Sequence, residues 1–157
     1  MGPCGAASVD GLFWRVDASP VNPFQSAEMY DDGQHNDALA GDGIYGAVLA
    51  AQRNNTVVEF YVQALDLEGN VRTWPAPALN QSDDPIQEAN ALYQVDDNAS
   101  GVSAPLYRIT MRETERAELQ SYPGSSPWTD AGMNATFIAI DGSGTEMRID
   151  GMHDITS

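Results

Sequence analysis

The residues best suited to chemistry lie in one acidic stretch, "MYDDGQHNDALAGDGIYGA", residues 29–47. It holds four aspartates and four glycines in nineteen residues and no lysine or arginine. Clustered carboxylates on a turn supply the hard oxygen ligands that calcium takes, six to eight in number. The candidate metal ligands are Asp31, Asp32, Asp37 and Asp42. Calcium is the only cofactor that the sequence suggests.

The same stretch also fits a purely structural turn. Its spacing does not match the twelve-residue loop of an EF-hand, nor does it alternate aspartates at every second position. Asp and Asn side chains accept hydrogen bonds from nearby backbone N–H groups, and Gly33, Gly41 and Gly43 can take positive φ. Tyr45 would then anchor the turn, with its hydroxyl bonded to the turn backbone. We favour this structural turn and keep calcium as the alternative.

Composition excludes several classes of function. The 157 residues carry 23 acids against seven bases, a net charge of −16, which repels nucleic acid and anionic lipid. All seven bases are arginine, so no lysine can form a Schiff base or hold a nucleotide phosphate. No apolar run approaches the roughly 20 residues that span a bilayer. We expect no nucleic-acid partner and no membrane insertion.

No catalytic constellation emerges from the other polar residues. His35 and His153 are far apart and have no partner at the spacing of a zinc site. The sequence contains no G-x-S-x-G elbow, Walker A loop or G-x-G-x-x-G loop. We therefore predict that the chain is not an enzyme. A carbohydrate-stacking surface is a weaker alternative, built from the aromatic residues Trp14, Trp74, Trp128, Tyr30 and Tyr61.

The elements that position these residues are mainly strands. Alternating apolar residues predict strands at 11–18, 44–50, 56–66 and 71–74, and the last three would form an antiparallel meander. Residues 79–104 are rich in proline and small polar residues and read as a linker, with a short extended segment in "ALYQVDD". A strand at "PLYRITM" would run into a helix that ends near residue 120, with Thr110 and Glu113 as its capping box. The hairpin of strands 135–140 and 145–149 follows.

The order of these motifs resembles a known set of proteins. "DDGQHNDALAGDGIYGA", "FYVQALDLEGN" and "RTWPAPA" are similar to an immunoglobulin- or fibronectin III-like module of exported bacterial proteins that carry lamin-tail domains and a spore-coat-protein-H-like (CotH) kinase domain. "PLYRITMRETERAEL" and "MNATFIAIDGSGTEMR" resemble the opening of that kinase-like domain. The nucleotide site and catalytic carboxylates expected further along are absent from this sequence, so no catalytic residue carries over.

The predicted architecture combines these observations. We expect an immunoglobulin-like antiparallel β-sandwich at 8–78, short at its front, then a linker at 79–104 and an incomplete α+β segment at 105–157. The resemblance implies a non-catalytic accessory module of an exported or surface-attached multidomain bacterial protein, whose partners are its neighbouring domains and whose export signal lies outside this chain. The alternatives are a calcium-dependent adhesion or carbohydrate-binding module, and a truncated fragment of a CotH-type kinase.

Overall fold

Strands dominate the fold. The computed structural model describes residues 8–79, 82–97, 105–121, 133–141, 143 and 145–152. These residues form two antiparallel sheets, one small hairpin and one helix, so the predicted mainly β class is confirmed. No described helix has the length and apolar character needed to cross a membrane.

The first sheet is organised around β3 (Val57–Leu65), the segment with the clearest alternation in the sequence. β1 (Ser8–Val16) pairs along one edge of β3, and β2 (Gln25–Ala27) pairs with β1. The other edge of β3 holds two strands end to end: β7 (Ala91–Gln94) beside residues 57–60 and β4 (Val71–Trp74) beside residues 62–65. All of these pairings are antiparallel.

The predicted strand at 44–50 is wrong. This segment contributes only an isolated bridge between Tyr30 and Gly46, and Ile44 and Val48 are exposed. Of the predicted meander, only β3 and β4 remain as neighbours. The edge of β3 that the third strand would have used is taken by β1, which pairs with β3 along nearly its whole length. Local alternation made residues 44–50 compatible with a strand but left them no free edge.

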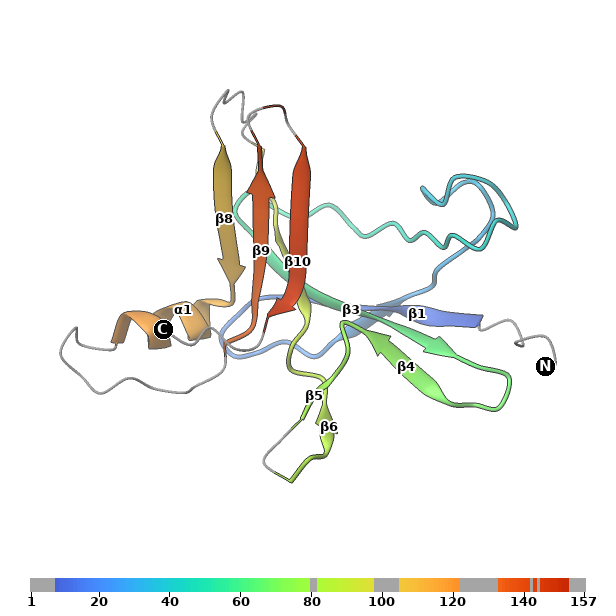
Figure 1. Cartoon of the computed structure of the whole chain (residues 1–157), viewed down its shortest axis with the longest axis horizontal. Coiled ribbons are helices and arrows are strands. Elements are labelled where there is room, and N and C mark those ends of the chain that lie inside the picture. Colours follow the sequence, from blue (N-terminus) through green and yellow to red (C-terminus); the bar gives the residue numbers. More distant parts are fainter. Residues whose placement is uncertain are drawn as a thin grey trace.

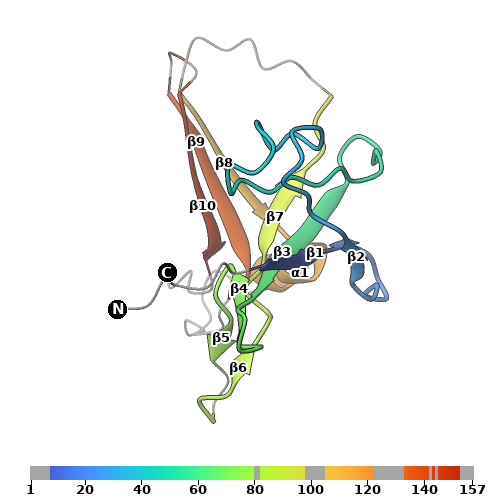
Figure 2. The same cartoon turned by 90° about the vertical axis from the view of Figure 1, so that its right-hand side faces the viewer.

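Part of the predicted linker is a strand of the first sheet. β7 lies within residues 79–104 and is fully paired with β3. Before it, β5 (Ala78–Leu79) and β6 (Pro85–Ile86) form a two-stranded hairpin that projects away from both sheets (Figures 1 and 2). The chain therefore returns to the first sheet before it begins the second.

The second sheet has the order β10–β9–β8 and stands across the first (Figure 1). Its strands are β8 (Leu106–Met111), β9 (Ala135–Ile140) and β10 (Glu146–Met152), which confirms the predicted hairpin. Helix α1 (Glu113–Ser121) follows β8 directly. β7 contacts all three strands, so it is the element that the two sheets share. Leu92 of β7 and Ala135 of β9 are both completely buried.

Candidate functional site

The acidic loop is held together by carboxylates that accept hydrogen bonds from its own backbone. Asp37 is completely buried, and its Oδ2 accepts from the N–H groups of Asp32 and Gly33, the latter at 2.7 Å. Its Oδ1 accepts from the His35 N–H at 3.1 Å. Asp37 thus serves as the centre around which residues 32–37 turn.

Asp31 accepts backbone hydrogen bonds in the same way from the second half of the loop. Its Oδ1 accepts from the N–H of Gly41 at 2.6 Å, and its Oδ2 from the N–H of Gly43 at 3.0 Å. Gly33, Gly41 and Gly43 have φ of 73°, 78° and 84°, as predicted for glycines in this turn.

The remaining two candidate ligands are engaged in the same manner. Asp32 accepts from the Gln34 N–H at 2.9 Å and lies 3.0 Å from Nδ1 of His35, and this side-chain hydrogen bond to His35 lowers the pKa of Asp32. Burial works to raise the pKa of Asp37, but its bonds from backbone N–H groups outweigh burial and lower it. Asp42 accepts from the Ile44 N–H at 2.9 Å. Both lowered pKa values favour the ionised form of Asp32 and Asp37.

The four carboxylates do not converge on a shared point. Within the ranges that the structure describes, no three or more His, Cys, Asp and Glu side chains gather as metal ligands would. The geometry matches the structural turn, in which each carboxylate serves the backbone. A calcium site formed by Asp31, Asp32, Asp37 and Asp42 stays a prediction for a binding measurement.

The anchor of the loop is Tyr30 rather than Tyr45. Tyr30 exchanges two backbone hydrogen bonds with Gly46, at 2.9 and 2.8 Å, and its ring stacks on His35 with centroids 4.3 Å apart. The Tyr45 hydroxyl has no hydrogen bond to any described residue, so the predicted tyrosine corner is not formed. Gly46 packs so tightly that an added Cβ would lie 2.0 Å from the carbonyl oxygen of His35.

The aromatic residues considered for carbohydrate stacking do not form one platform. Trp14 is buried, and Tyr61, one register position away, stacks on Phe13 on the opposite face of the sheet. Trp74 is half exposed and contacts Phe60, and Tyr30 belongs to the acidic loop. Trp128 lies outside the described residues.

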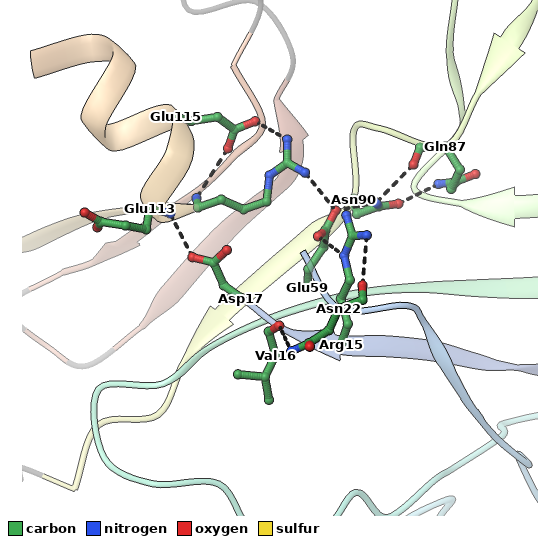
Figure 3. Close-up of polar contacts among 10 residues, drawn as sticks. Arg15, Val16, Asp17, Asn22, Glu59, Gln87, Asn90, Glu113 and Glu115 are labelled. Carbon is green, nitrogen blue, oxygen red and sulfur yellow. Dashed lines mark hydrogen bonds and ion pairs between the residues drawn. The ribbon is translucent and has the colours of Figure 1, made fainter. Parts of the chain in front are cut away.

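A second polar site, which the sequence did not single out, lies at the junction of the two sheets (Figure 3). Its centre is Glu59 of β3, only 1% exposed. Glu59 Oε2 accepts from Arg15 Nε at 2.6 Å, and Oε1 accepts from Asn90 Nδ2 at 2.6 Å. Nη1 of Arg112 lies 3.8 Å from Oε1. Three segments of the chain therefore meet on one buried carboxylate.

The start of helix α1 continues this network. Arg112 Nη2 donates to Glu115 Oε1 at 2.6 Å, and the Arg112 backbone N–H donates to Glu115 Oε2 at 3.3 Å. Asp17, just after β1, accepts the first helical N–H, that of Glu113, at 2.7 Å. The predicted capping box with Thr110 is therefore wrong, because Thr110 is buried within β8 and Asp17 does the capping.

The hydrogen bonds to Glu115 and the neighbouring carboxylates fix the charge of Arg112. The side-chain hydrogen bond to Glu115 raises the pKa of Arg112 the most; partial burial opposes this, and the charges of Glu115 and Glu59 add to the rise. Each oxygen of Glu59 accepts a hydrogen bond, so the carboxylate links β3 to β1 and to the segment before β7. We name the cluster formed by Arg15, Asp17, Glu59, Asn90, Arg112 and Glu115 the polar joint.

The outer edge of β7 completes the contact between the sheets. The Leu92 N–H donates to the Thr136 hydroxyl at 2.9 Å, and the Leu92 carbonyl accepts from Arg148 Nη2 at 2.6 Å. Asp150 binds both partners, accepting from the Thr136 hydroxyl at 2.9 Å and pairing with Arg148 at 2.7 Å. Side chains of the second sheet thus satisfy backbone groups that an edge strand would otherwise leave unpaired.

Comparison with known proteins bears on the first sheet. Residues 18–71 match the family model of the conditioned medium factor second Ig-like domain. This part of the chain resembles an Ig-like domain. The match covers β2, the acidic loop and β3 and lies within the predicted sandwich, so the Ig-like, mainly β fold is confirmed. No curated protein and no solved structure matches the chain.

Proposed function

We propose that this chain is a non-catalytic accessory module that positions a neighbouring domain within a larger, exported bacterial protein. The observation that carries the proposal is the polar joint, which connects the segment after residue 104 to the Ig-like sheet: Arg112 lies against the buried Glu59, and Asp17 accepts a hydrogen bond from the Glu113 N–H. A flexible tether would need none of these contacts. The match to an Ig-like domain supports the same role.

The finer assignment rests on the sequence resemblance. We propose that the neighbouring domain is of the CotH kinase-like type, that lamin-tail domains accompany it, and that the whole protein acts outside the cell. In this view the segment from residue 105 is the first part of the neighbouring domain. The polar joint then sets the orientation between that domain and the Ig-like module.

Two measurements test the proposal. The first is the length of the mature polypeptide in culture fractions of the producing bacterium, detected with an antibody against this chain. We expect a polypeptide well above 16.9 kDa in the exported or surface fraction. A product of 16.9 kDa confined to the cytosol would reject the proposal.

The second measurement concerns the rigidity of the joint. Hydrogen exchange of the chain, followed by mass spectrometry, should show the amides of β3 and β9 protected to a similar degree. In Arg112→Met, which keeps the stem but removes the charge, protection of β9 should fall while β3 stays protected. Thr114→Val, an exposed change on α1, is the matched control. Equal protection of β9 in Arg112→Met and Thr114→Val would contradict a positioning role for the joint.

A further inference from the structure

The second sheet is more apolar on its outer face than on the face that packs against β7. Thr136 and Arg148 point inward, to β7. Register places Ile109, Phe137 and Ile149 together in one row of the opposite face, and Tyr107, Ala139 and Met147 in the next. We call these six residues the outer apolar face.

The outer apolar face is open to solvent. Tyr107 is 69% exposed, Ile109 57%, Met147 55% and Ile149 45%, and the Tyr107 ring stacks on Phe137 with centroids 6.1 Å apart. An antiparallel sheet with one wet face normally turns its polar residues to water. Here the six apolar residues face outward, whereas Arg108, Thr136 and Arg148 lie on the inner face beside Ile138 and Ile140. Such a surface is typical of a sheet that another element covers.

The size of the outer apolar face indicates what kind of partner covers it. The face consists of six residues, far fewer than the roughly 20–30 residues a side of a stable complex between separate chains. A contact within one polypeptide is stable with a smaller surface, because the covalent link gives a high effective concentration. Two copies that each carry a charge of −16 would also repel each other.

We infer that the outer apolar face is the packing surface for an apolar element from the remaining part of the neighbouring domain, in the same polypeptide. The inference rests on the proposed function, since it requires such a domain. It adds the surface that the domain uses and the chemistry of the contact. The polar joint would fix one side of the second sheet, and the rest of the neighbouring domain would cover the other.

Methionine oxidation tests the inference directly. Met147 lies on the outer apolar face, whereas Met29 lies at the acidic loop and serves as the internal reference. Hydrogen peroxide is added to the 157-residue chain and to the longer polypeptide isolated from the producing cell, and sulfoxide at each methionine is followed by mass spectrometry. We expect Met147, relative to Met29, to be oxidised at least about fivefold more slowly in the longer polypeptide. Equal relative rates in the two proteins would overturn the inference.

A pair of variants distinguishes a face covered by the rest of the neighbouring domain from a face covered by a second copy of the chain. Met147→Glu places a charge on the outer apolar face, and Leu67→Glu places one on the β3–β4 turn, where Leu67 is 79% exposed. In the 157-residue chain both variants should sediment as monomers and melt like the parent. In the longer polypeptide only Met147→Glu should lower the melting temperature. A dimer of the 157-residue chain that only Met147→Glu dissociates would overturn the inference in favour of self-association.

Failure of the proposed function has a different signature. If no polypeptide longer than 16.9 kDa is found, the proposed function fails and the inference falls with it. If the longer polypeptide is found but Met147 is not protected, only the docking surface is wrong.

Discussion

Glu59→Gln is the most direct test of the polar joint. The substitution keeps the size of the side chain but replaces one carboxylate oxygen with an amide NH₂. Oε2 accepts from Arg15, and Oε1 accepts from Asn90 and lies near Arg112. Whichever position the NH₂ takes, it faces a donor, and the arginines lose the charge that pairs with them.

The magnitude follows from burial. Glu59 is 1% exposed and the Arg15 side chain 15%, so the pair is only weakly screened by solvent. Breaking a buried pair while leaving its partner in place costs about 3 kcal/mol or more of the free energy of unfolding. With a denaturant slope of about 2 kcal/mol per molar urea, the unfolding midpoint should fall by about 1.5 M. Glu68→Gln makes the same chemical change at an exposed turn and should move the midpoint very little.

Urea unfolding is followed by tryptophan fluorescence, which reports on Trp14 in the core of the first sheet. Glu59→Gln, Arg15→Met and the double variant form a cycle, in which the arginine change should cost less once Glu59 is already neutral. If the losses in the free energy of unfolding from the two single substitutions simply add in the double variant, the pair is not coupled. A midpoint for Glu59→Gln equal to that of Glu68→Gln would refute the reasoning about the joint altogether.

Four further outcomes are expected. Gly46→Ala should lower the melting temperature measured by circular dichroism, because its Cβ would lie 2.0 Å from the His35 carbonyl oxygen. The pKa of Asp37 in the folded chain is lowered from 3.8. Ionised Asp37 therefore stabilises the folded chain fully above pH 3.8, and this stabilisation is lost as the pH falls through the lowered pKa. Asp37→Asn should reduce the acid dependence of the urea midpoint. Thr136→Val leaves the Leu92 N–H without its acceptor and should cost about 1–3 kcal/mol, with faster hydrogen exchange in β9. Millimolar calcium should give neither heat in calorimetry nor a shift in melting temperature, because the loop carboxylates are already engaged by backbone N–H groups; a clear shift would establish the calcium alternative.

Some of the fold was predictable because its causes are local. β3 and the β9–β10 hairpin follow from alternation and turn residues over a few positions. The same local evidence failed at residues 44–50, where alternation is clear but β1 already occupies the neighbouring edge of β3. Which segment pairs with the edge of a strand depends on the whole chain, and a few neighbouring residues do not contain that information.

The acidic loop was predictable in its role but not in its anchor. Aspartates and glycines at these spacings favour carboxylates that bind the backbone, as Asp31 and Asp37 do. The choice between Tyr30 and Tyr45 turned on Gly46, whose missing side chain lets the backbone of Tyr30 and the His35 carbonyl come close to it. A glycine in an extended segment is the one signal that pointed to this close contact.

The polar joint shows why a charge in a strand is hard to interpret from sequence alone. Glu59 stands among apolar residues in "VVEFYV", which is equally typical of a solvent-facing position on a half-buried strand. Its partner Arg15 is 44 residues away, and Asp17 is 96 residues from the helix start that it caps. Of the seven arginines, five form ion pairs with carboxylates in the part of the chain that the structure describes. Three of these five lie where the two sheets meet: Arg15 and Arg112 in the polar joint and Arg148 at the edge of β7. In a chain with so great an excess of acids, the few bases are concentrated where the two sheets meet, and there each one neutralises a carboxylate that would otherwise be too costly to bury.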